Sequence, residues 1–129
     1  MPYGTSMPPT APERAAILQG TLDVLILRTL SAGANHGYGI AKRLRETSDE
    51  VILVEEGTLY PGLHRLEKRG FVESEWQMTD TNRRAKYYKL TRDGRAKLKT
   101  DTVAWETLSG AIDRVLGTSA RNDIAGALA

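Results

Sequence analysis

The chain has 129 residues, enough for one domain with a single core, because a second core would need a longer chain. Lysine and arginine together number 18 and the acidic residues 16, so the formal net charge is only +2. There is no cysteine, which excludes disulfides, thiolate nucleophiles and sulfur-bound zinc. This composition is typical of the reducing cytoplasm, where we expect the protein to reside. No apolar run approaches the roughly 20 residues that a membrane-spanning helix requires.

The first half of the chain predicts a short tail and two helices. Residues 1–13 are rich in proline and lack the apolar stretch of a signal peptide, so we predict a disordered tail there. Apolar residues then follow the period of an amphipathic helix that begins near residues 19–21. Residues 31–37 contain two glycines and an asparagine, which end this helix. Residues 38–47 predict a second helix. The apolar positions of the first helix are Leu18, Leu22, Leu25, Ile26 and Leu30.

Residues 51–54 are apolar and mostly β-branched, which fits either a brief strand or an extended link into the next helix. In that next helix, Leu59, Leu63 and Leu66 share one face, since an α-helix turns about 100° per residue. Polar and compact residues occupy the opposite face and its shoulders. The opposite face carries Gly57, Pro61, His64 and Lys68, and the shoulders carry Thr58, Tyr60 and Arg65.

The ends of this third helix are marked by proline and glycine. Pro61 has no N–H and is tolerated in a first turn, so we predict a start near Gly57, with Gly57 or Thr58 as the cap. Gly70 suits a left-handed stop. Gly62 lies inside the helix, where it costs about 1 kcal/mol relative to alanine. We expect it to permit close approach of another backbone at the exposed front.

The second half predicts a hairpin and a long helix. Residues 71–76 and 86–90 read as two strands joined by a polar turn, and Thr91 can cap a last helix over residues 92–117. Apolar residues of that helix form a heptad-like seam too long for the core of so small a domain, so a second copy is the simplest partner. The predicted dimer-interface residues are Leu98, Trp105, Leu108, Ile112 and Val115.

Charge is concentrated between Arg83 and Lys99, where eight basic residues face a single acidic one. Such a block suggests a polyanion-binding face, although a solvated charged surface is the simpler alternative. Three helices, a two-stranded wing and a long helix indicate a mainly α, α+β fold: a winged helix-turn-helix with a C-terminal dimerisation helix. A helix of about 10–12 Å diameter fits the roughly 12 Å major groove of DNA. The predicted DNA-binding residues are Gly57, Thr58, Tyr60, Pro61, His64, Arg65, Lys68, Arg83, Arg84 and Lys86.

Some of these residues have a second interpretation. Tyr60 could contact a phosphate or act as a half-buried wedge between helices. His64 and Arg65 can reach base edges or phosphates, and Thr58 and Arg65 are expected to influence sequence preference. Lys68 is expected to contact a phosphate, and the wing cations the backbone or the adjacent minor groove. Catalysis is not expected, because the only histidines, His36 and His64, belong to no known catalytic or metal-binding motif. We therefore predict neither a cofactor nor a metal.

Three segments, "HGYGI" from His36, "GTLYPGLHRLEKRGF" from Gly57 and "RRAKYYKLTRDGR" from Arg83, resemble the signatures of PadR-type transcriptional regulators. The resemblance covers residues 18–116 and is greatest to the branch with a single C-terminal dimerisation helix. Gly39 and Gly62 depart from residues common in the family.

The resemblance implies a ligand-responsive homodimeric repressor on a palindromic operator. The sequence divides into a DNA-binding domain over residues 14–91, a dimerisation helix over residues 92–117 and, where periodicity is lost, a frayed tail from 118 to 129. In some relatives an aromatic residue on the last helix faces its symmetry mate across a pocket for flat, drug-like molecules. Trp105 could have that role or could simply pack in the seam. The alternative function is a dimeric protein-interaction adapter that does not bind DNA specifically.

Overall fold

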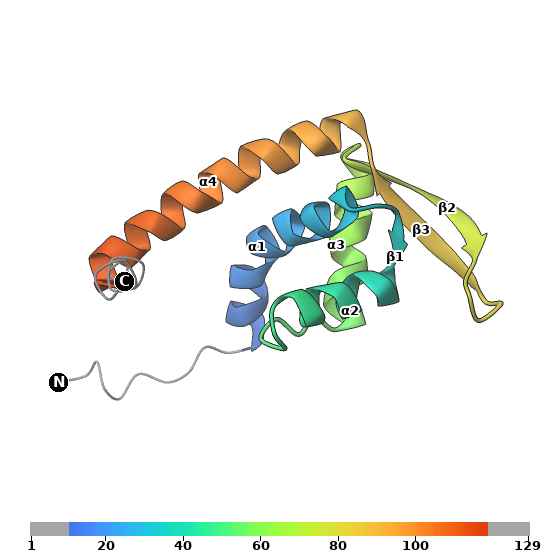
Figure 1. Ribbon diagram of the computed structural model, residues 1–129, viewed down its shortest axis with the longest axis horizontal. Coiled ribbons are helices and arrows are strands. Elements are labelled where there is room, and N and C mark those ends of the chain that lie inside the picture. Colours follow the sequence, from blue (N-terminus) through green and yellow to red (C-terminus); the bar gives the residue numbers. More distant parts are fainter. Residues whose placement is uncertain (1–10, 119–129) are drawn as a thin grey trace, which may run out of the picture.

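The protein is represented by a computed structural model that describes residues 11–118 (Figure 1). The predicted winged-helix architecture is confirmed, since three helices and a small antiparallel sheet precede one long helix. The sheet has the strand order β1-β3-β2. In chain order the elements are α1 (Ala11–Ser31), β1 (Asn35–His36), α2 (Gly37–Thr47), α3 (Glu56–Lys68), β2 (Val72–Met78), β3 (Arg84–Leu90) and α4 (Arg92–Leu116).

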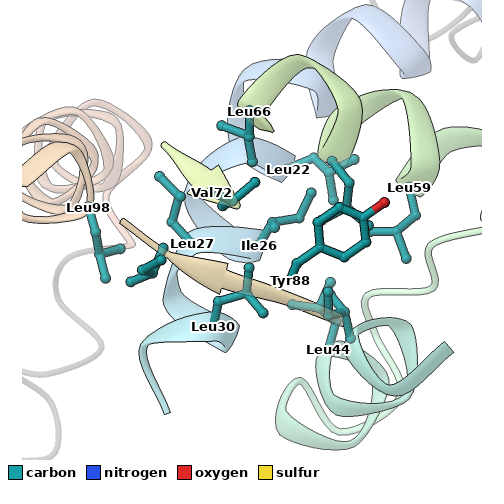
Figure 2. Packing of buried hydrophobic residues seen from close by; sticks show 13 residues of the cluster. Leu22, Ile26, Leu27, Leu30, Leu44, Leu59, Leu66, Val72, Tyr88 and Leu98 are labelled. Carbon is teal, nitrogen blue, oxygen red and sulfur yellow. The ribbon is translucent and has the colours of Figure 1, made fainter. Parts of the chain in front are cut away.

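One apolar cluster holds α1, α2, α3 and the sheet together (Figure 2). The three leucines of the predicted inner face of α3 are completely buried, and so are Ile26 and Leu27 of α1. Each such side chain stabilises the fold by about 1.5–3 kcal/mol relative to an exposed one. The core therefore fixes α3 along one side and leaves its other side free. The cluster comprises Leu22, Ile26, Leu27, Leu30, Ile40, Leu44, Leu59, Leu63, Leu66, Val72, Tyr88, Leu90 and Leu98.

Helix α1 begins earlier than predicted. It starts at Ala11 rather than near residues 19–21, so the last three residues of the predicted tail are helical, and Gly20 lies inside the helix. The sequence is compatible with this start, because alanine is the best helix former and Pro12 falls in the first turn. The rest of the predicted N-terminal tail, and residues 119–129 of the predicted C-terminal one, lie outside the described residues.

A third strand was missed within the segment predicted only as a turn. Strand β1 pairs antiparallel with β3, with Asn35 opposite Tyr88 and His36 opposite Tyr87. Two residues are too few to show a period of two. His36 also caps α2, because its Nδ1 atom accepts a hydrogen bond from the N–H of Gly39 at 3.2 Å. A side chain at Gly39 would overlap that of Asn35, which explains the glycine there.

Helix α3 begins one residue before Gly57, within the predicted region, but its cap differs. Its first residue is Glu56 and its N-cap is Glu55, which makes no side-chain capping bond, so the predicted cap at Gly57 or Thr58 is wrong. Pro61 consequently lies beyond the first turn, where it has no N–H to donate to the carbonyl of Gly57. Residues 51–55 form an extended link without a strand, the second of the two predicted alternatives.

The role predicted for Gly62 is corrected by its position. Gly62 is buried on the side of α3 that faces α1, and not at the exposed front. A β-carbon there would lie 3.2 Å from the Cδ1 atom of Ile26 and 3.5 Å from Cδ2 of Leu22. The glycine thus allows α3 to pack closely on the side chains of α1. Glycine disfavours the helix by about 1 kcal/mol relative to alanine, but it allows this closer packing of the core.

Helix α4 starts against the sheet and then extends away from the helical body (Figure 1). The predicted cap is confirmed, since Thr91 Oγ1 accepts the N–H of Gly94 at 3.0 Å. A β-carbon at Gly94 would overlap the carbonyl oxygen of Phe71, so only glycine lets α4 pack this closely on the backbone just before β2. Leu98 is buried in the core of its own chain, so little of its side chain remains exposed for the predicted dimer interface.

Candidate nucleic-acid interface

The front of α3 is open to solvent along its length. Five of the predicted DNA-binding residues on it are exposed, and Thr58 is partly exposed. They are held there because the leucines on the opposite side of the same helix are buried. The arrangement presents a backbone with small side chains at the N-terminal end and cationic side chains farther on. The exposed five are Gly57, Tyr60, Pro61, His64 and Lys68.

Arg65 differs from these residues. Its Nη2 atom lies 3.2 Å from Oδ1 of Asp23 on α1, and the two side chains are 35% and 16% exposed. The guanidinium therefore points toward the helical body. Contact between Arg65 and a DNA base stays a prediction, and it requires the ion pair with Asp23 to open.

Tyr60 packs between two helices. A β-carbon at Gly37 of α2 would lie 2.7 Å from the hydroxyl oxygen of Tyr60, so the tyrosine ring occupies the space that this glycine leaves. The position supports the interpretation of Tyr60 as a wedge between α2 and α3. The side chain is still 45% exposed, so contact with a phosphate remains a prediction.

The wing is the hairpin of β2 and β3, and its two sides differ. Side chains alternate between sides along a strand, and the register puts Val72 opposite Leu90 and Trp76 opposite Lys86 on the side that faces α3. We call this the inner side of the wing. Arg83 lies at the exposed turn, whereas Arg84 and Lys86 lie on the inner side. The predicted basic wing thus has two cations directed to the same side as α3.

Glu67 at the end of α3 joins the helix to the wing. Its Oε1 atom lies 3.7 Å from Nζ of Lys86, and Oε2 accepts a hydrogen bond from the hydroxyl of Ser74. Tyr88 lies beside this group, and burial, the Glu67 carboxylate and Tyr60 raise the pKa of its phenol above 10.0. The contacts fix the orientation of the wing relative to α3.

Beyond Leu98, the apolar side chains of α4 are exposed. The four remaining predicted seam residues are 44–87% exposed. A groove of about 490 Å³ runs between α1 and α4, and Trp105 and Leu108 line it together with Val24, Asp23 and Asp101. The chain alone does not bury this seam. The exposed seam residues are Trp105, Leu108, Ile112 and Val115.

Across the described side chains, no three histidine or carboxylate groups gather closely enough to bind a metal ion. Among the helices of residues 11–118, none combines the length and the apolar character that crossing a bilayer requires.

Comparison with known proteins identifies the family. The model of the family described as "Transcriptional regulator PadR-like family" matches residues 26–100. The chain belongs to this family. The match extends from the core of α1 through α3 and the wing into the first turns of α4, so it contains every predicted DNA-binding residue. The protein is accordingly a DNA-binding transcriptional regulator, as the sequence predicted.

Individual PadR-like relatives agree with this assignment. The transcriptional regulator Rv3488 of Mycobacterium tuberculosis is 43% identical over 65 residues, which cover 50% of this chain and 60% of the relative. A transcriptional regulator from Clostridium thermocellum is 33% identical, with a TM-score of 0.69 over 77% of this chain and 96% of the other. A PadR-like regulator from Bacillus cereus is 27% identical, with a TM-score of 0.67 over 78% and 96% of the two chains. These relatives are transcriptional regulators and not enzymes.

Three residues of the interface were missed from the sequence. Asp23 and Glu67 act through partners on other elements, which no local pattern reveals. Trp76 could have been found, because the alternation that places Val72 on the inner side of the wing also places Trp76 there.

Proposed function

We propose that this PadR-like regulator is a cytoplasmic homodimeric repressor that binds a palindromic operator and is released by a small-molecule ligand. Each copy inserts α3 into the major groove and rests its wing on the adjacent backbone or minor groove. The observation that carries the proposal is the joint exposure of the front of α3 and of the wing cations on one side of the fold.

The long helix supports the dimer. The exposed part of α4 carries a repeating apolar seam, and monomeric proteins rarely leave such a surface in water. A second copy of the seam would cover Leu108 and Ile112 from each chain. Two copies related by a two-fold axis would then place two α3 helices on successive turns of DNA, which a palindromic operator matches.

The groove between α1 and α4 supports ligand response. Its wall combines the indole of Trp105 with the carboxylates of Asp23 and Asp101, which suits a flat molecule with an apolar body. A ligand there would contact α4 beside the proposed dimer seam and α1 beside α3. We infer that binding changes the distance between the two α3 helices and lowers operator affinity.

Selection of bound DNA from a random pool tests the proposal, with the full chain as the selecting protein. We expect a palindrome whose half-sites lie about one helical turn apart. Affinity for that site should fall steeply with salt, because each phosphate contact releases close to one counterion. When the selection is repeated in the presence of candidate flat aromatic compounds, the protein should retain less DNA. Weak, sequence-independent binding with little salt dependence would instead favour the adapter function.

A triple variant tests the wing directly. Replacing Arg83, Arg84 and Lys86 by alanine should weaken operator binding and reduce the salt slope by up to about 2.7, at about 0.9 per lost contact. Replacing Lys42, Arg43 and Arg45 on the exposed part of α2 gives a matched control with the same charge change. An unaltered slope in the wing variant would show that the wing does not contact DNA.

A further inference from the structure

The inner side of the wing stays apolar where no core covers it. Near the helices its residue pairs are buried, as with Val72 and Leu90. Farther out, Trp76 and Met78 occupy the same side but are 58% and 57% exposed. Burial in this chain does not explain a tryptophan at that position.

Trp76 has one specific neighbour. The guanidinium carbon of Arg84 lies 5.0 Å from the centre of the Trp76 ring, within the range of a cation–π contact. Arg84 is directly opposite Met78 in the register, so it reaches diagonally across the hairpin to Trp76. The contact with Trp76 thus gives the side chain of Arg84 a preferred direction on an exposed part of the strand.

An aromatic partner leaves the charge of Arg84 available, whereas a carboxylate partner would offset it. A guanidinium that stacks on a ring keeps the N–H donors at its edge, and the ring does not neutralise its charge. Lys86 on the same side lies 3.7 Å from the carboxylate of Glu67, which offsets its charge. Arg84 is therefore an oriented wing cation whose full charge remains available to an anion.

The outer side of the wing carries exposed acidic side chains. Glu73 and Glu75 are exposed on it, and Lys89 there lies 3.3 Å from Glu73. A polyanion would be repelled by these carboxylates and attracted by Arg84 on the inner side. Charge complementarity therefore selects the inner side, which also faces α3, for contact with DNA.

We propose that Trp76 is a positioning residue for DNA binding, whose ring holds the guanidinium of Arg84 toward a backbone phosphate beside the half-site. This inference rests on the proposed operator binding. Trp76 itself need not touch DNA. An ordered arginine loses less conformational freedom on binding than a free one, so removing the ring should weaken binding even though the charge remains.

The test is a double-mutant cycle on the selected operator with the full chain. Trp76→Leu and Arg84→Ala should each weaken binding by about three- to tenfold, and the double variant should bind no more weakly than Arg84→Ala. Trp76→Phe keeps a ring and should stay within about twofold of the unsubstituted protein. Met78→Ala is the matched control, because it removes an equally exposed apolar side chain from the same side. Its affinity should also stay within about twofold of the unsubstituted protein.

Several outcomes would overturn the inference. Fold-changes of Trp76→Leu and Arg84→Ala that multiply in the double variant would mean that the residues act independently. Equal losses for Trp76→Leu and Trp76→Phe, or for Trp76→Leu and Met78→Ala, would mean that the ring has no special part. Thermal unfolding of each variant shows whether a loss of DNA affinity comes from a less stable fold. The proposed operator binding fails separately, if the unsubstituted protein selects no site.

Discussion

The Nη2 atom of Arg65 lies 3.2 Å from Oδ1 of Asp23, and this contact joins α3 to the first helix of the core. Asp23 also lines the groove between α1 and α4. One carboxylate thus touches both the candidate ligand groove and the helix that carries the candidate base contacts.

We predict that Asp23→Asn lowers the free energy of unfolding, because it removes the ion pair with Arg65. The loss should be only about 1 kcal/mol, because solvent screens a partly exposed pair. It should also strengthen non-specific DNA binding severalfold, because a negative charge is lost and the guanidinium of Arg65 is freed. Denaturant unfolding and titration with random-sequence DNA measure the two effects. Asp113→Asn on α4 removes the same charge away from α3, and an equal gain in that control would mean that Arg65 is not released.

We predict that Thr58→Val changes the preferred operator sequence at one position by about 1–3 kcal/mol, because valine has the shape of threonine without its hydroxyl. Repeating the selection with the variant measures this change. His64→Ala should act at a different position. Arg65→Ala separates the two roles of that arginine: a changed preference supports base contact, whereas a uniform loss of affinity supports only its contact with Asp23.

We predict that replacing both Leu108 and Ile112 by aspartate separates the dimer into single chains. Burying uncompensated charges in an apolar seam should raise the dimer dissociation constant by at least about 100-fold. Sedimentation equilibrium gives the mass directly. Thr107→Asp is the control, because residue 107 lies about 120° around α4 from the centre of the seam. A single-chain mass for the unsubstituted protein would contradict the proposed dimer.

We predict that Gly94→Ala lowers the free energy of unfolding by about 1–3 kcal/mol or more, because the new methyl group would overlap the carbonyl oxygen of Phe71. Gly110→Ala in the same helix meets only an ordinary contact at 3.6 Å and should be neutral or up to about 1 kcal/mol stabilising. Thermal unfolding of both variants gives the comparison. Equal stability of the two variants would mean that α4 does not pack this closely on the backbone of Phe71.

We predict that Tyr88 makes the fold sensitive to alkali. Burial, with the carboxylate of Glu67 and with Tyr60, raises the pKa of Tyr88 in the folded state, so the neutral phenol is favoured there. Its contribution to stability is complete below pH about 10 and is lost as the pH rises through the folded pKa. The unfolding free energy of Tyr88→Phe should therefore decline less steeply above pH about 10.

The features predicted correctly are those with a local period. The buried leucines of α3 recur at helical spacing, so the inner face of that helix was evident. The family signatures gave the order of elements and the class of protein. These patterns determine which side of each element faces the core.

The errors concern features with no local pattern. Strand β1 exists only because two residues pair with β3. The pair of Asp23 and Arg65 joins positions 42 residues apart, and Leu98 shares its spacing with the seam although the core covers it. Each of these is decided by tertiary contact.

Helix α4 leaves the body as one uninterrupted element of 25 residues, which at about 1.5 Å per residue extends for roughly 37 Å. That length is close to one full turn of B-DNA, about 34 Å. In the proposed dimer, the length of α4 and the angle at which the two α4 helices cross would set the distance between the two α3 helices. No hinge interrupts α4 between residues 92 and 116. Tolerance for altered operator spacing would then have to come from bending the DNA.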